Sequence, residues 1–150
     1  MARIAELEFP DELFYDAKER LWLRPAPGGE VTVGIDAGGH DALGAAVYLQ
    51  LADPGRHLAR GEALGSLEAE KMVRPLLAPV SGMLVAVNRA AMATPRLLSS
   101  DPYGGGWLFR IRASDWEDES RLLLFGSEAV TAWVKAELAV HPPRGASGRA

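Results

Sequence analysis

The chain contains no cysteine, and this absence excludes disulfide bonds, thiolate metal sites and a thiol nucleophile. It has no apolar run near the roughly 18 residues that a membrane span needs. The N-terminal "MARIAELEFPDEL" also lacks an apolar core of signal-peptide length. We therefore expect a cytoplasmic protein that makes no contact with a membrane.

Positive charge is scarce as well, because 16 Lys and Arg residues stand against 20 Asp and Glu, for a net charge of −4. The cations are scattered along the chain, so we expect no surface for nucleic acid. The three histidines, His40, His57 and His141, lack the spacing of metal ligands, and we expect each on the surface or in a loop. No Gly-x-Ser-x-Gly motif is present. These absences leave no hydrolase signature.

Short apolar and β-branched segments separated by Gly and Pro fill the first two thirds of the chain. A length of 150 residues with 48% hydrophobic residues suits one domain with a real core, which we place at about residues 15–125. Many short strands at this spacing predict a mainly β sandwich or barrel. The predicted strands are "EVTVGI" (30–35), "AAVYLQL" (45–51), "ALGSLEA" (63–69), "GMLVAVN" (82–88) and "GWLFRIRA" (106–113).

The last third of the chain is helical in pattern. "SDWE" is a capping-box sequence, in which Ser114 caps and Glu117 reaches back, so we expect a helix from there to about Gly126. A second helix at 127–139 carries an apolar stripe that should pack on the sheet. Its members are Val130, Trp133, Val134 and Leu138. The small, polar, proline-bearing tail at 141–150 is expected to be flexible.

One lysine, Lys71, lies in "GSLEAEKMVRPLLAPVSG" between two strand-like runs, which places it near a β-turn exposed to solvent. An amine with an ordinary pKa near 10.4 is acylated only when an enzyme positions and deprotonates it. Exposure at a hairpin tip would allow this. From its surroundings alone, Lys71 is either a solvated lysine or the attachment point of a prosthetic group.

An ordered series of motifs resembles the lipoyl-carrying H-protein family of the glycine cleavage system over most of residues 15–125. The blocks are "VTVGI", "ALGAAVYLQL", "GEALGSLEAEK", "PVSGMLVAVN" and "DPYGGGWLFRI". The resemblance implies a lipoyl/biotinyl-type barrel-sandwich hybrid of two small antiparallel sheets with helices on the C-terminal side. It also implies lipoate on Lys71, attached by a lipoate ligase or lipoyl transferase, and a carrier that catalyses nothing itself.

Six further residues are predicted to shape this site. Gly61 and Gly82 frame the hairpin and are expected to permit tight turns. Four others flank the arm, and they are Glu68, Glu70, Met72 and Arg74.

The sequence departs from the family pattern in three places. Met72 after the lysine resembles the Met-Lys-Met of biotin carriers. Leu21, in "RLW", stands where the family shows His-Glu-Trp, and Pro75 replaces a common acidic residue. In the family, such acids suit a cationic aminomethyl cargo. Their loss favours another cargo, and Arg74 could pair with an anionic sulfur group.

On this basis the preferred hypothesis is an H-like lipoate-binding protein that works with a heterodisulfide-reductase-like complex of sulfur oxidation. One alternative is a glycine cleavage H protein that carries the aminomethyl group among the P, T and L proteins. A further alternative is an unmodified interaction module or a biotin carrier. Intact Lys71 and its regular hairpin favour a modified carrier.

Overall fold

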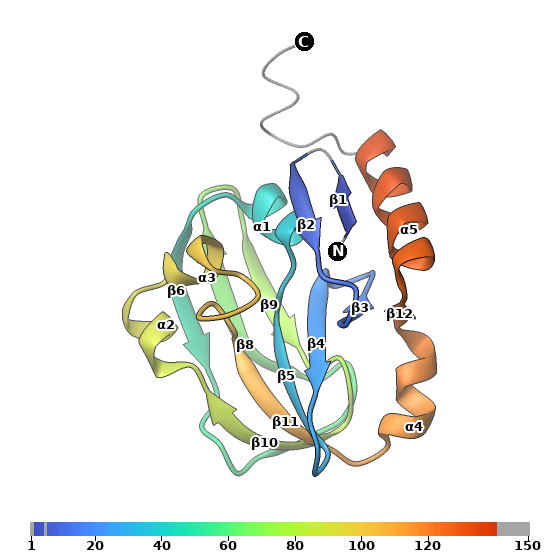
Figure 1. The fold of residues 1–150 in the computed structure, drawn as a ribbon. Coiled ribbons are helices and arrows are strands. Elements are labelled where there is room, and N and C mark those ends of the chain that lie inside the picture. Colours follow the sequence, from blue (N-terminus) through green and yellow to red (C-terminus); the bar gives the residue numbers. More distant parts are fainter. Residues whose placement is uncertain (1, 5, 141–150) are drawn as a thin grey trace.

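Strands dominate the computed structural model, which describes residues 2–4 and 6–140 (Figure 1). The strands are β1 (Ala2–Ile4), β2 (Leu7–Phe9), β3 (Phe14–Asp16), β4 (Leu21–Pro25), β5 (Glu30–Ile35), β6 (Ala46–Leu51), β7 (His57–Leu58), β8 (Ala63–Ala69), β9 (Val73–Leu77), β10 (Gly82–Val87), β11 (Phe109–Ala113) and β12 (Leu124–Phe125). The helices are α1 (Ala37–Leu43), α2 (Arg89–Ala93), α3 (Leu97–Ser100), α4 (Trp116–Glu119), the 3₁₀ turn η1 (Ser120–Leu122) and α5 (Ser127–Val140). The tail predicted to be flexible, 141–150, lies outside the described residues.

Two antiparallel sheets face each other and form the body of the molecule. The larger sheet has seven strands in the order β12-β3-β4-β5-β11-β10-β7, and the smaller has three in the order β6-β8-β9. The mainly β class with C-terminal helices is thereby confirmed. The larger sheet exceeds the small sheet that the sequence led us to expect, and β1 and β2 add a separate two-stranded sheet.

The core lies between the inner faces of the two sheets, where alternate residues of each strand are buried. On β5 these are Val31, Val33 and Ile35, and on the small sheet they include Leu49 and Leu67. Within the small sheet, a glycine allows strands β6 and β8 to lie close together. A β-carbon at Gly65 would lie 2.1 Å from the backbone oxygen of Gln50 on the neighbouring strand β6.

The helix predicted from Ser114 to about Gly126 is wrong in its extent. Helix α4 begins after Asp115, which makes no side-chain capping bond, and it ends at Glu119. The Glu119 carboxylate instead accepts hydrogen bonds from the Ser81 backbone N–H (2.7 Å) and hydroxyl (2.8 Å). Residues 124–125 then pair with β3. Tertiary bonds to the turn before β10 and to β3 therefore override the local helical pattern.

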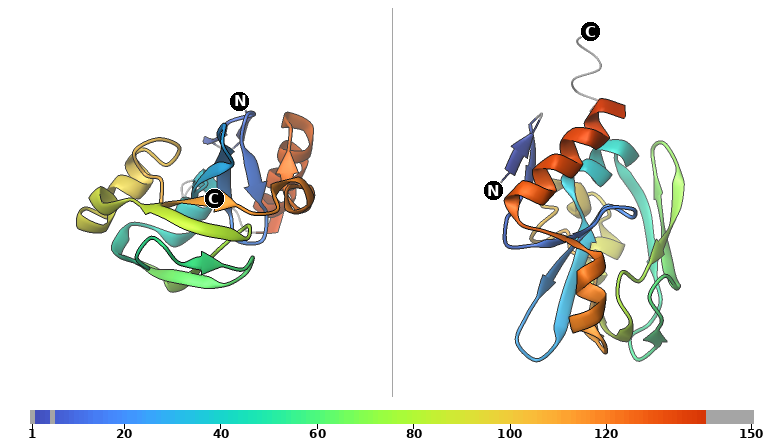
Figure 2. Two further views of the ribbon diagram at one scale, coloured as in Figure 1. Left: turned by 90° about the horizontal axis from the view of Figure 1, so that it is seen from below. Right: turned by 90° about the vertical axis from the view of Figure 1, so that its right-hand side faces the viewer.

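Helix α5 confirms the second helical prediction and covers the outside of the larger sheet (Figures 1 and 2). Val130 and Val134 are buried in a second apolar cluster with Phe9, Tyr15 and Trp22. None of the described helices combines the length and the apolarity that crossing a membrane requires.

Candidate functional site

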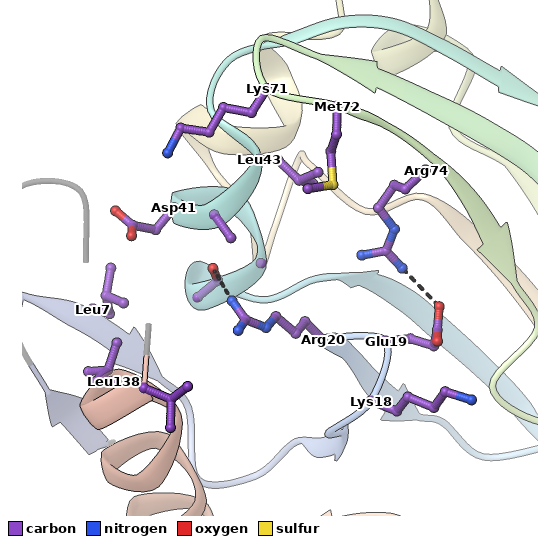
Figure 3. A pocket seen from close by; sticks show the side chains of 14 residues that line it. Leu7, Lys18, Glu19, Arg20, Asp41, Leu43, Lys71, Met72, Arg74 and Leu138 are labelled. Atoms are coloured by element: carbon purple, nitrogen blue, oxygen red, sulfur yellow. Dashed lines mark hydrogen bonds and ion pairs between the residues drawn. The ribbon is translucent and has the colours of Figure 1, made fainter. Parts of the chain in front are cut away.

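Lys71 lies at the tip of the hairpin that joins β8 to β9, and its side chain is exposed, so the predicted location is confirmed. The turn is closed by a hydrogen bond from the Ala69 N–H to the Met72 carbonyl (2.9 Å). Figure 3 shows the Lys71 side chain extended above a hollow, with Met72 directed into it. The amine is thus free to react while the backbone that carries it is held.

A second segment, the connection between α1 and β6, supports this tip. The Glu70 N–H donates to the Ala45 carbonyl (2.9 Å), and the Lys71 N–H donates to the Leu43 carbonyl (3.2 Å). The Ala45 N–H in turn donates to the Glu70 carboxylate (2.7 Å). Glu70 therefore holds the tip in place. Sequence analysis missed this support because it predicted no helix at α1, which contains the helix-breaking pair Gly38 and Gly39.

The hollow beneath Lys71 is a groove of about 610 Å³ between the hairpin, α1, the β3–β4 turn and the end of α5. Its size falls within the roughly 300–1,000 Å³ of small-molecule sites. The apolar part of its lining includes Leu7, Leu43, Met72 and Leu138. Charged side chains add Lys18, Glu19, Arg20, Asp41 and Arg74. We call this hollow the lysine groove.

Two of the groove's cations are already paired with carboxylates. Arg74 lies 3.3 Å from Glu19, and the two side chains are only 15% and 19% exposed. Burial lowers the pKa of Arg74, while the Glu19 carboxylate opposes that shift. Arg20 donates to the Gly38 carbonyl (3.1 Å) and pairs with Glu137 (3.2 Å). Neither guanidinium is free to take up a cargo without leaving its partner.

The two positions that depart from the family's acidic pattern do not line the lysine groove. Leu21 is fully buried in the core, and Pro75 lies opposite Ser66 on the outer face of the small sheet, where it is exposed. Asp41 of α1 does line the groove, and Figure 3 shows it on the side toward which the Lys71 amine extends. The groove thus contains a carboxylate that sequence reasoning missed, because α1 was not predicted.

The two predicted framing glycines have different surroundings. Gly61 has a left-handed φ of +88° in the turn before β8, and its N–H donates to the Ala78 carbonyl (2.8 Å). Gly82 lies within β10, where a β-carbon would come within 2.2 Å of the Arg112 carbonyl oxygen. The tight turn predicted at Gly82 is therefore wrong, and close contact between strands explains that glycine.

Two buried titratable groups, Asp36 and His40, belong to α1. Asp36 caps the helix by accepting from the Gly39 N–H (2.8 Å), and burial raises its pKa to about 7. His40 is 8% exposed, and burial lowers its pKa to about 4. The surface or loop position predicted for His40 is wrong, whereas exposed His57 agrees with it and His141 lies outside the described residues.

Among the described residues no cluster of histidine and acidic side chains could hold a metal ion. The chemistry available at the site is that of one exposed primary amine beside a partly apolar, charged groove. Such an arrangement suits a lysine that bears a covalent group and a surface that receives it.

Comparison with known proteins agrees with this geometry. The family model for the glycine cleavage H-protein matches residues 13–137. The chain is 42% identical to the glycine cleavage system H protein of Gloeobacter violaceus, over 75% of this chain and 86% of that protein. It is 41% identical to the one from Thermus thermophilus, over 78% and 90%. The crystal structure of a glycine cleavage system H protein from Mycobacterium marinum superposes with a TM-score of 0.72 at 36% identity, covering 83% of this chain and 98% of that one. The chain belongs to the glycine cleavage H-protein family.

Proposed function

We propose that this chain is a non-catalytic lipoyl carrier of the glycine cleavage system, in which Lys71 bears lipoate and presents the aminomethyl cargo to the P, T and L proteins. The observation that carries the proposal is the exposed Lys71 on a supported hairpin tip above the lysine groove. Membership of the H-protein family, over residues 13–137, favours glycine cleavage over other uses of the same scaffold.

The residues around Lys71 fit a lipoyl group. Leu7, Leu43, Met72 and Leu138 give the groove apolar walls for an acyl chain. When bound, lipoate supplies a disulfide whose reduced sulfurs can hold a cargo. The hairpin backbone keeps the attachment point fixed, and amide formation removes the Lys71 charge. A tether of this kind raises the effective concentration of cargo at each partner.

Asp41 supports the aminomethyl cargo. A carboxylate beside a cationic group favours the ammonium form, most strongly where water is reduced. Asp41 lines the groove on the Lys71 side and is part of the helix that holds the tip.

A sulfur-oxidation carrier is the second candidate, and cations in the groove favour it. Lys18, Arg20 and Arg74 all line the groove and would attract an anionic sulfur cargo. Two of them are held by Glu137 and Glu19, so this candidate needs those pairs to open. An Arg74→Ala protein with unchanged transfer kinetics would remove the role of Arg74.

The attachment is tested by the intact mass of the protein from lipoate-supplied cells that express a lipoate ligase, with Lys71→Arg alongside. We expect a lipoyl increment on the wild type and none on the variant. A biotinyl increment would move the protein to the carboxylase carriers. No increment with any cognate ligase would leave Lys71 as an ordinary surface lysine.

The cargo is tested separately with the lipoylated protein, purified P, T and L proteins of a glycine cleavage system, NAD⁺ and tetrahydrofolate as the acceptor of the one-carbon unit. Glycine-dependent reduction of NAD⁺ by the wild type, and none by Lys71→Arg, is the expected result. Failure of the lipoylated wild type to support this reaction would oppose the glycine cleavage role and favour the sulfur candidate.

A further inference from the structure

Sulfur is scarce in this chain, and one methionine differs from the others in its exposure. The chain has no cysteine, so its four methionines contain all of its sulfur. Of the methionines that the structure describes, Met72 is 51% exposed, whereas Met83 and Met92 are partly buried. Met1 lies outside the described residues. Among the described residues, Met72 is therefore the thioether that a small oxidant in solution reaches most easily.

Met72 has a fixed place in the wall of the lysine groove. It directly follows Lys71, and Figure 3 shows its sulfur directed into the hollow beside Leu43. The Met72 carbonyl accepts the Ala69 N–H (2.9 Å), which holds the backbone of the turn. An oxygen atom added to this sulfur would therefore make the apolar wall polar next to the attachment lysine.

The cations of the groove are poorly placed to bind such an oxygen. Arg20 and Arg74 both line the groove, and each is held by a carboxylate. Lys18 also lines it, but Figure 3 shows its amine directed away from Met72. A sulfoxide oxygen at Met72 would thus be satisfied by water. An apolar group that packs against Met72 would have to displace that water, which is unfavourable.

We propose that Met72 is a site of reversible oxidation by hydrogen peroxide, and that its sulfoxide weakens the seating of the group attached to Lys71 in the lysine groove. The inference rests on the proposed function, in which Lys71 bears an acyl arm. The sulfur lone pair attacks one peroxide oxygen, so that an S–O bond forms and the O–O bond breaks. A proton moves to the departing hydroxide, and water leaves. The sulfur loses two electrons, and the peroxide gains them.

The thioether can be restored. A methionine sulfoxide reductase takes two electrons from thiols, breaks the S–O bond and releases the oxygen as water. The site is thus suited to reversible control of the arm rather than to its removal.

The position of Met72 makes this effect local. Met92 packs against the core cluster and Met83 lies on β10, and neither lines the lysine groove. Oxidation of Met72 changes the polarity beside Lys71, while the backbone bonds that hold the turn remain. The arm would therefore spend more time in solvent without being detached.

The first test uses the full-length unmodified protein, hydrogen peroxide and peptide mass mapping. We expect Met72 to be oxidised at least about threefold faster than Met83 and Met92, because access governs the rate. Methionine sulfoxide reductase should restore the original mass, and circular dichroism should show that the oxidised protein is folded. Equal rates at the three methionines would overturn the site.

The second test uses the lipoylated protein and measures how fast a water-soluble phosphine reduces the lipoyl disulfide. Peroxide treatment should raise the rate about fivefold or more in the wild type, because a polar oxygen in the groove wall disfavours the seated arm. Met72→Gln, a polar side chain of similar length, should show the higher rate without peroxide. Met72→Leu keeps an apolar wall and cannot be oxidised, so it should stay slow before and after peroxide. This variant also controls for oxidation of the arm itself.

Two results would contradict the effect on the arm. One is a reduction rate that peroxide leaves unchanged in the wild type, and the other is a rise that is equal in wild type and Met72→Leu. Either result would leave the carrier function standing. If the wild type cannot be lipoylated at all, the proposed function fails, and the effect on the arm fails with it. The peroxide test on the unmodified protein distinguishes these cases, because it addresses the oxidation site alone.

Discussion

Two glycines near the Lys71 hairpin should respond differently to an added methyl group. Gly61→Ala places a β-carbon in open space at a left-handed φ of +88°, which costs about 1–2 kcal/mol. Gly82→Ala places one 2.2 Å from the Arg112 carbonyl oxygen, so strands β10 and β11 must separate. We expect Gly82→Ala to lower the free energy of unfolding by more than Gly61→Ala does, by about 3 kcal/mol or more. Urea unfolding of the two variants measures the difference.

Gly61 and Gly82 should also affect the lipoylation of Lys71. Valine at Gly82 should reduce lipoylation because it disturbs the strand after the hairpin, and valine at Gly61 should reduce it because the turn before β8 is strained. Normal lipoylation of both valine variants would show that neither glycine matters for presentation of Lys71. Equal stability of the two alanine variants would contradict the assignment of Gly82 to a close strand contact.

Helix α1 should make stability depend on pH through Asp36. Its folded pKa of about 7 lies above the ordinary 3.8, so between these values the folded state holds a proton that the unfolded chain releases. Its contribution to stability is therefore present at pH 4 and lost as the pH rises through 7. Asp36→Asn keeps a capping oxygen and removes this titration. Relative to wild type, the variant should gain roughly 3–4 kcal/mol in free energy of unfolding between pH 4 and pH 7.

His40 acts in the opposite direction within the same helix. Its folded pKa of about 4 lies below 6.5, so its contribution is present above pH 6.5 and lost as the pH falls through 4. Denaturant titrations of wild type and Asp36→Asn at several pH values separate the two effects. If the difference in free energy of unfolding between wild type and Asp36→Asn stayed constant from pH 4 to pH 7, the raised pKa of Asp36 would be contradicted.

Strands and helices that are marked by a local sequence pattern could be predicted from the sequence. Those that depend on contacts with distant residues of the chain could not. Strands β5 and β8 have the predicted bounds because β-branched and apolar residues lie between clear breaks. Helix α1 was missed because Gly38 and Gly39 have poor helix propensity. Gly39 is there because a β-carbon would lie 2.6 Å from Ile35. Only the tertiary contact reveals that reason.

The residues of the site also fall into those that the local sequence predicts and those that only the structure reveals. Lys71 could be located from its flanking strands alone, and the motifs around it indicated the attached group. Asp41, Glu19 and the α1–β6 support come from segments distant in sequence, and no local pattern pairs them with the hairpin. Sheet pairing and loop packing create the lysine groove, which is why its lining required the structure.

At the scale of the whole molecule, one ion pair joins the two sheets. Arg74 extends from β9 on the inner face of the small sheet to Glu19, which lies in the turn between β3 and β4 of the large sheet. Both side chains are largely buried, so removal of one partner leaves the other charge poorly solvated. Glu19→Gln should therefore lower the free energy of unfolding by about 1–3 kcal/mol, a range reduced for the residual exposure of the pair.

A second substitution distinguishes a stranded charge from simple loss of packing. In the background of Glu19→Gln, Arg74→Met removes the unpaired guanidinium and keeps an apolar side chain opposite Leu67 of β8. The double variant should be more stable than Glu19→Gln alone, because a buried charge without its partner costs more than a well-packed apolar replacement. Chemical unfolding of wild type, both single variants and the double variant gives the coupling energy. A double variant less stable than Glu19→Gln would mean that Arg74 holds the two sheets together through contacts other than this pair.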